Sequence, residues 1–187
     1  MVTRFTIAII TCLVFITLSF AQSDLPKEIT PQLLDKLKIE VDKEAIKFKQ
    51  TISKKQMLDD EIEFAVDTFK ISLLAEKKMD INYSTPGMNS AVYDQADAYD
   101  KLLNKYYSKL MKLLELNDKQ TLIAAQKAWL IFRDSELKLI STLRKEKYSG
   151  GGTIQSNIYA SEYCNLILKR TEDVFNYYIA IKRYVLQ

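Results

Sequence analysis

The segment Gln126–Glu136 carries the side chains best suited to hold a charged group. It reads Gln-Lys-Ala-Trp-Leu-Ile-Phe-Arg-Asp-Ser-Glu. At 100° per residue, one face of a helix collects Gln126, Trp129, Arg133, Glu136 and Ile140, and the opposite, wet side collects Lys127, Asp134 and Lys138. Arg133 therefore points with the apolar face, where an unpaired charge costs on the order of several kcal/mol.

Arg133 needs a partner, and the sequence offers three candidates. Glu136 lies one turn away, Asp100 is the candidate from the preceding helix, and Trp129 can stack on the guanidinium. Such a cluster either contacts a ligand or forms a polar network that fixes the register of packed helices. We favour the structural role, because no nucleophile accompanies these residues.

The composition argues against most catalytic chemistry. The chain has no histidine, which removes the usual residue of transition-metal sites and of acid/base or nucleophilic catalysis. The carboxylates of Asp59, Asp60, Glu61 and Glu63 lack the spacing of a Ca²⁺ loop, and we expect them on a solvated helix face. A formal net charge of +3 gives no footprint for nucleic acid. We expect no enzyme activity, cofactor or metal.

A second candidate site is the segment Tyr-Ser-Gly-Gly-Gly-Thr, which holds three of the four glycines in the chain. The backbone must bend or flex there. No Gly-Lys-Ser/Thr follows and no strand precedes it, so a phosphate-binding loop is disfavoured. An aromatic ring and adaptable hydroxyl groups on a connection between long helices suit a protein partner. The preferred binding residues are therefore Tyr148, Ser149, Gly150, Gly151, Gly152 and Thr153.

The elements that position these residues are helices. Few glycines and prolines, with charged and apolar residues mixed at helical spacing, predict an all-α antiparallel helical bundle with an N-terminal two-helix extension. Thr30-Pro31 and the Ser84–Pro86 stretch are typical of an N-cap followed by proline in the first turn. Helices are expected at about residues 31–53, 58–79, 86–116, 118–147 and 154–186.

Residues 1–21 have the features of a signal peptide. Arg4 precedes an apolar run over residues 7–20, and Ser19 and Ala21 supply the small residues of a cleavage site. We expect an exported protein, periplasmic or secreted, with no stable membrane insertion after cleavage. Cleavage would leave Cys164 as the single cysteine, so we expect it to be a small buried apolar residue. Residues 22–82 would form the extension and residues 83–187 the main domain.

Several motifs in the same order resemble the lysozyme inhibitor LprI-like family. The central motif is a Gln-x-x-Trp-x-x-Phe-Arg-Asp helix. Upstream of it lie Met88-Asn89, Asp100, Leu103-Asn104 and Tyr107, and downstream lies the Arg170-Thr171 pair. Together these motifs cover about residues 83–178. The signature residues of this resemblance are Asp100, Asn104, Tyr107, Gln126, Trp129, Phe132, Arg133, Asp134, Glu136 and Arg170. Family members often carry cysteines where this chain has Ala91, Leu137 and approximately Glu162, so no disulfide-held loop is expected here.

The resemblance implies an exported binding protein that inhibits a protein partner, lysozyme or another muralytic enzyme. A slightly basic chain gains no long-range steering toward a basic lysozyme, which argues mildly against this function. The alternative is a structural or assembly module of the bacterial envelope that acts through helix-mediated protein contacts. Its support is the pair of amphipathic segments before Tyr83, which could leave an apolar stripe unfilled.

Overall fold

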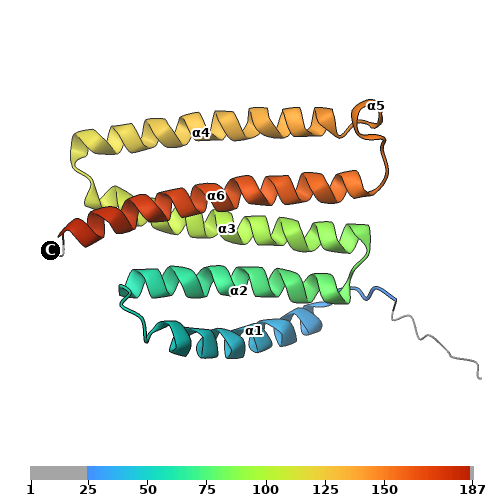
Figure 1. Cartoon of the computed structure of the whole chain (residues 1–187), viewed down its shortest axis with the longest axis horizontal. Coiled ribbons are helices and arrows are strands. Elements are labelled where there is room, and N and C mark those ends of the chain that lie inside the picture. Colours follow the sequence, from blue (N-terminus) through green and yellow to red (C-terminus); the bar gives the residue numbers. More distant parts are fainter. Residues whose placement is uncertain (1–24, 186–187) are drawn as a thin grey trace, which may run out of the picture.

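The computed structural model describes residues 25–185, which form six helices and no strand (Figure 1). This confirms the prediction of an all-α fold. The helices are α1 Pro31–Ile52, α2 Asp59–Ile81, α3 Thr85–Leu113, α4 Leu116–Leu143, α5 Glu146–Ser149 and α6 Ile154–Val185. None of the helices in this described part is long and apolar enough to span a bilayer. The predicted signal peptide lies outside the described residues.

Two helices begin as the sequence predicts. The Thr30 hydroxyl accepts a hydrogen bond from the Leu33 amide at 3.3 Å, and the Ser84 hydroxyl accepts one from the Gly87 amide at 3.1 Å. Proline follows each cap in the first turn, where a missing amide hydrogen costs nothing. The fourth helix is shorter than predicted, because it ends at Leu143 and a separate turn, α5, follows.

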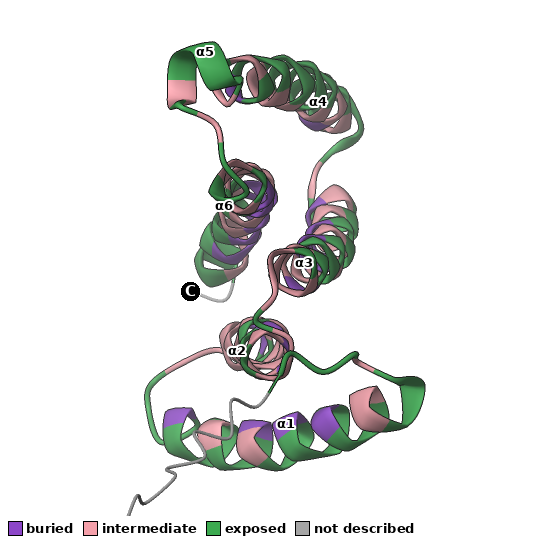
Figure 2. Ribbon diagram, turned by 90° about the vertical axis from the view of Figure 1, so that its right-hand side faces the viewer, coloured by how far each residue is buried: buried purple, intermediate pink, exposed green. Residues whose placement is uncertain are grey.

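The helices stack in layers around a central pair, α3 and α6 (Figure 1). On one side of this pair lies α2, with α1 outermost and crossing α2 at a steep angle, and on the other side lies α4 (Figure 2). From α2 onward, consecutive long helices run antiparallel, so α3 and α6 run parallel. Their register is fixed by the buried Thr171 hydroxyl, which donates to the Tyr99 carbonyl at 3.1 Å.

The core lies along the α3–α6 seam and extends to α2. Tyr106 is fully buried, and its ring meets Phe64 and Phe175 edge-on while those two rings stack on each other at 3.8 Å. Such aromatic packing contributes beyond the area that it buries. Cys164 is buried in the same core, where burial raises the pKa of its thiol to about 11, as expected for a small apolar residue.

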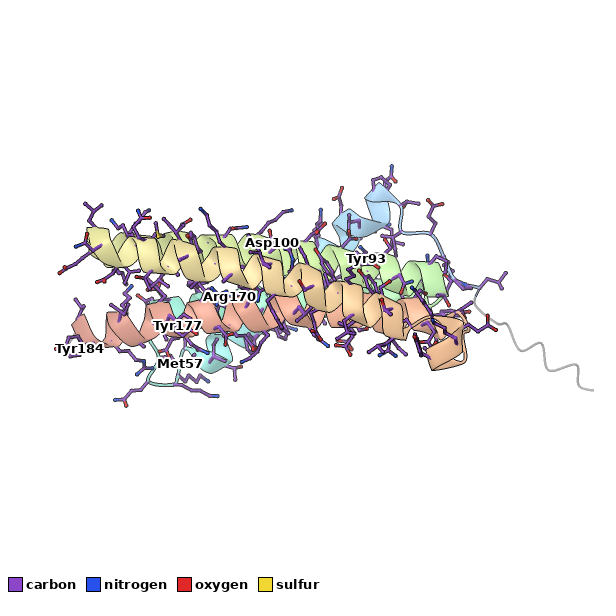
Figure 3. All side chains as sticks on the ribbon, turned by 90° about the horizontal axis from the view of Figure 1, so that it is seen from above. Met57, Tyr93, Asp100, Arg170, Tyr177 and Tyr184 are labelled. Atoms are coloured by element: carbon purple, nitrogen blue, oxygen red, sulfur yellow. The ribbon has the colours of Figure 1, made fainter. Side chains whose placement is uncertain are left out.

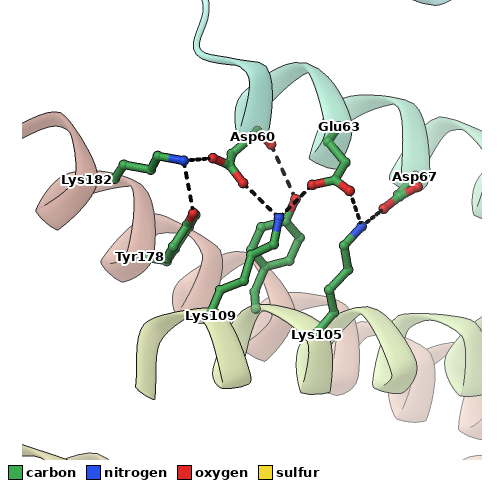
Figure 4. A network of polar contacts seen from close by, with 8 residues as sticks. Asp60, Glu63, Asp67, Lys105, Lys109, Tyr178 and Lys182 are labelled. Carbon is green, nitrogen blue, oxygen red and sulfur yellow. Dashed lines mark hydrogen bonds and ion pairs between the residues drawn. The ribbon is translucent and has the colours of Figure 1, made fainter. Parts of the chain in front are cut away.

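Asp60 is the centre of an ion-pair network that joins α2 to α3 and α6 (Figure 4). One carboxylate oxygen accepts from the Lys109 ammonium at 2.7 Å, and the other accepts from Lys182. Lys109 also pairs with Glu63 at 2.6 Å, while the Tyr106 hydroxyl donates to the Asp60 carbonyl at 3.3 Å. A network of this kind holds three helices in one register.

The prediction that Asp59, Asp60, Glu61 and Glu63 form a solvated face was wrong for two of them. Asp60 is only 8% exposed. Glu61 is partly buried, accepts the Leu58 amide at 2.8 Å and pairs with Arg183 at 2.7 Å. The physical reason is that the ends of α3 and α6 cover the N-terminus of α2, which no pattern within α2 reveals.

The network makes stability depend on pH. Burial alone would raise the pKa of Asp60, but hydrogen bonds from Lys109 and Lys182 outweigh it and lower the pKa to about 2. A carboxylate whose pKa is lower in the folded state stabilises the fold above its unfolded pKa. That stabilisation is lost as the pH falls toward 2.

Replacing Asp60 with Asn should lower the free energy of unfolding at pH 7 by about 2 kcal/mol, since the variant cannot pair with Lys109 and Lys182. The difference from the parent should shrink between pH 4 and pH 2, where the parent's own Asp60 takes up a proton. Urea unfolding across this pH range measures both effects.

The matched control is Asp35→Asn, because the Asp35 side chain is 73% exposed and faces Lys38 only at 3.9 Å. We expect a change of less than about 0.5 kcal/mol at every pH. A deficit in the Asp60 variant that stays constant down to pH 2 would contradict the network's role.

Candidate functional site

Four of the signature residues come together between α4 and α6. The Arg170 guanidinium donates from Nε to the Gln126 side-chain oxygen at 2.9 Å. The Trp129 ring lies 5.8 Å from the Arg170 guanidinium carbon and 5.5 Å from that of Arg133. Figure 3 shows Arg170 along the α4–α6 side of the molecule. One indole ring thus contacts two cations, which is the arrangement of cation–π interactions.

Arg133 finds a partner that the sequence did not predict. Its Nε and Nη2 donate to one carboxylate oxygen of the adjacent Asp134, at 2.9 and 2.7 Å. Glu136 and Asp100 were the expected carboxylates, but the Asp100 carboxylate instead accepts from Asn104 at 3.0 Å. The long Arg133 side chain reaches the edge of the interface, where exposed Asp134 folds back to meet it. The predicted contact with Trp129 is confirmed.

Arg170 is the more deeply buried guanidinium, with 8% of its surface exposed. Its Nη2 has no hydrogen-bond partner among residues 25–185, and no carboxylate in this range forms an ion pair with it. A buried cation with a single neutral acceptor is held mainly by Gln126 and by the Trp129 ring. Loss of Gln126 should therefore be costly.

The remaining signature residues do not join this cluster. Phe132 is half exposed, and the exposed Asp134 meets the cluster only at its edge, through Arg133. Tyr107 is partly buried and packs against the core, whereas Asn104 is exposed and bonds within α3 to Asp100. The signature therefore divides between the α4–α6 seam, the outer face of α4, and α3.

The second candidate site is the connection between α4 and α6 at residues 144–153, which contains α5 and which we call the α5 corner. Gly150, Gly151 and Gly152 all have positive φ, between 76° and 88°, so this backbone path requires residues without a β-carbon. The Ser149 hydroxyl donates to the Arg144 carbonyl at 2.9 Å and accepts from the Gly151 amide at 3.2 Å. The Gln155 side-chain amide donates to the Gly151 carbonyl at 3.2 Å.

The α5 corner exposes cations and one aromatic ring at the end of two long helices (Figure 1). Tyr148 is 59% exposed, and the Lys147 ammonium lies 4.6 Å from the centre of its ring. Within the described residues, Arg144, Lys145 and Lys147 form no ion pair. The predicted binding segment is thus a protruding, locally basic surface.

No metal or catalytic arrangement is evident at either place. The described range 25–185 contains no group of three or more His, Cys, Asp or Glu residues placed to hold a metal ion. The two arrangements can hold charge and present a surface, which is the chemistry of binding.

Sequence reasoning missed the burial of Arg170, although a signal for it exists. Arg170 falls on the same helical stripe as Ile167, Thr171 and Val174, which are all buried. A single arginine on such a stripe predicts a buried guanidinium. Sequence reasoning also missed the cations Arg144, Lys145 and Lys147, although they directly precede the glycine run and form a basic cluster in the sequence.

Comparison with protein-family models finds a match to the model described as Lysozyme inhibitor LprI, over residues 75–174. The matched range begins in α2 and ends in α6, so it includes the Gln126–Arg170 cluster and the α5 corner. It spans more than half of the chain. No curated protein and no solved structure matches.

Replacing Gln126 with Leu should destabilise the protein more than replacing Arg170 with Met. The first change leaves a buried guanidinium without its side-chain acceptor, at a cost of about 1–3 kcal/mol. The second removes the charge and fills its volume, which should alter the free energy of unfolding by less than about 1 kcal/mol or raise it. Chemical denaturation measures both. Lys127→Leu on the exposed side of α4 is the control, and the reverse order of stabilities would disprove this account of Arg170.

Proposed function

We propose, since this chain belongs to the lysozyme inhibitor LprI family, that it inhibits lysozyme or another muralytic enzyme by placing the α5 corner in that enzyme's active-site cleft. The observation that carries the proposal is the exposed basic and aromatic surface formed by Lys145, Lys147 and Tyr148. It stands on a corner whose backbone is fixed by three glycines and Ser149.

The chemistry of the target suits this surface. Lysozyme cleaves a glycosidic bond with two carboxyl groups, one of which must carry a proton while the other is ionised. An ammonium group brought near them favours the ionised form of both and so lowers the pKa of the acid. Lys145 and Lys147 would therefore oppose catalysis in addition to blocking the cleft.

Tyr148 supplies the anchor for such a contact. A tyrosine buries a large area with few rotatable bonds, and tyrosine is enriched among the residues that dominate binding energy. Tyr148 has 59% of its surface free to be covered. The ring and the neighbouring Lys147 would enter the partner together.

The net charge of +3 does not contradict this mode of binding. Overall charge governs long-range steering, whereas a cleft lined by carboxylates attracts cations that reach it. We expect association to be slow and the complex to depend on short-range contacts. Export is part of the proposal, because an inhibitor must share the compartment of a cell-wall-degrading enzyme, and residues 1–21 have the pattern of a signal peptide.

The double variant Lys145→Glu, Lys147→Glu should weaken inhibition at least about tenfold, because it sets carboxylates against the carboxylates of the cleft. The measurement combines lysis of cell walls by c-type and g-type lysozymes with calorimetry of complex formation. Both substituted positions are exposed, so the variant should keep its helix content.

The control is Lys36→Glu, Lys43→Glu on α1, which changes the net charge equally at exposed positions far from the α5 corner. We expect unchanged inhibition. If the two double variants weaken inhibition equally, the α5 corner is not the contact surface. If the parent protein neither binds nor inhibits at micromolar concentration, inhibition of these lysozymes is excluded.

A second candidate function is assembly in the bacterial envelope through the N-terminal helices. The observation in its favour is that Ile39 and Ile46, two turns apart on one face of α1, are 55% and 59% exposed although α2 covers the opposite face. Helix-mediated self-assembly predicts a mass above the monomer in native mass spectrometry. The variant Ile39→Ser, Ile46→Ser should then return it to the monomer, and a monomeric parent would remove this route to assembly.

A further inference from the structure

A pocket of about 330 Å³ lies beside the α5 corner, where α3, α4 and α6 meet. This volume falls in the range of small-ligand sites. Figure 3 shows Tyr93, one of its walls, toward the α5 end of the molecule. The lining residues are Tyr93, Ser141, Arg144, Lys145, Gln155, Ser156 and Tyr159.

The polar groups around this pocket are incompletely satisfied by the protein. The Arg144 Nε and the Gln155 side-chain oxygen are both buried and have no hydrogen-bond partner in the described part of the chain. The nitrogen of the same Gln155 amide is anchored to the Gly151 carbonyl at 3.2 Å, so the oxygen is held in a defined place. Buried polar atoms are nearly always paired, so this free donor and free acceptor beside a pocket favour a polar group, from water or a ligand, next to them.

The charge of the pocket selects an anion. Arg144 and Lys145 both line it, neither forms an ion pair within residues 25–185, and no Asp or Glu is among the lining residues. A guanidinium binds a carboxylate through a planar pair of N–H donors, and an adjacent ammonium adds a second positive charge. The pocket therefore carries a positive charge that favours a negatively charged ligand.

The remaining wall is aromatic. Tyr93 and Tyr159 line it from α3 and α6, and the Tyr93 ring continues to Tyr163 at 6.0 Å. Burial, followed by the neighbouring Tyr159 and Tyr163, raises the pKa of Tyr93, so its hydroxyl keeps its proton and can donate. The serine hydroxyls of Ser141 and Ser156 complete a surface that offers ring faces and hydrogen bonds.

We infer that this pocket binds a small sugar acid. The carboxylate would pair with Arg144 and Lys145, an N–H or hydroxyl group would donate to the Gln155 oxygen, and the sugar ring would lie against Tyr93 and Tyr159. This inference does not rest on inhibition of lysozyme, because it concerns a small ligand, and its test contains no enzyme.

The test titrates the ¹⁵N-labelled protein with N-acetylmuramic acid, which carries a carboxylate and an acetamido N–H, and follows the Arg144 Nε–H and Tyr93 and Tyr159 amide signals. We expect saturable shifts with a dissociation constant in the millimolar range. The matched probe is N-acetylglucosamine, which lacks the carboxylate and should bind at least about tenfold more weakly. Equal binding of the two sugars would overturn the inference. So would the absence of any shift at about 20 mM N-acetylmuramic acid.

Two variants locate the site. Arg144→Gln removes the guanidinium, and Ser141→Asp adds a negative charge at an exposed position of α4 that lines the pocket. Each should reduce binding of N-acetylmuramic acid at least about tenfold, whereas Lys127→Gln on the same helix should leave it unchanged. If Arg144→Gln fails to fold, Ser141→Asp still decides, and full binding by a folded Ser141→Asp variant would place the ligand elsewhere.

Discussion

The arrangement of this protein depends on one desolvated carboxylate. Asp60 lies at the N-terminus of α2, yet its two ammonium partners come from the C-terminal parts of α3 and α6. Burial alone would raise the pKa of this group, and the hydrogen bonds from both lysines lower it instead, so the buried charge is compensated by both helices. This pairing sets the register of the three helices together. Every other layer is built on that arrangement, with α1 packed on α2 and α4 packed on α6.

The two sides of the central pair are chemically different. Toward α2 the interface combines an aromatic core, with Tyr106, Phe64 and Phe175 in mutual contact, with the ion pairs around Asp60. Toward α4 it contains Trp129 and long cationic side chains in place of small apolar ones, and only Leu122 and Ile140 of α4 are buried. The α4 side, which carries both candidate sites, is therefore the side that contributes least to the core.

Much of the fold could be predicted from sequence because its signals are local. Caps at Thr30 and Ser84 and the apolar spacing within each helix depend on neighbouring residues, and they gave the helices nearly as observed. The partner of Arg133 and the burial of Asp60 could not be predicted, because both depend on which side chains another part of the chain brings close. The residues that the family model matches include both candidate sites.

Because α4 has few buried residues, local opening of this helix affects how long the surface around residue 148 keeps its structure. Proteins open in cooperative units, and a unit with few buried apolar side chains opens at a lower free energy than the whole molecule. With two buried residues, α4 is such a unit, and the α5 corner directly follows its C-terminal end. The lifetime of the surface around residue 148 would then be set by the local opening of this helix, while the α2–α3–α6 core stays closed to hydrogen exchange.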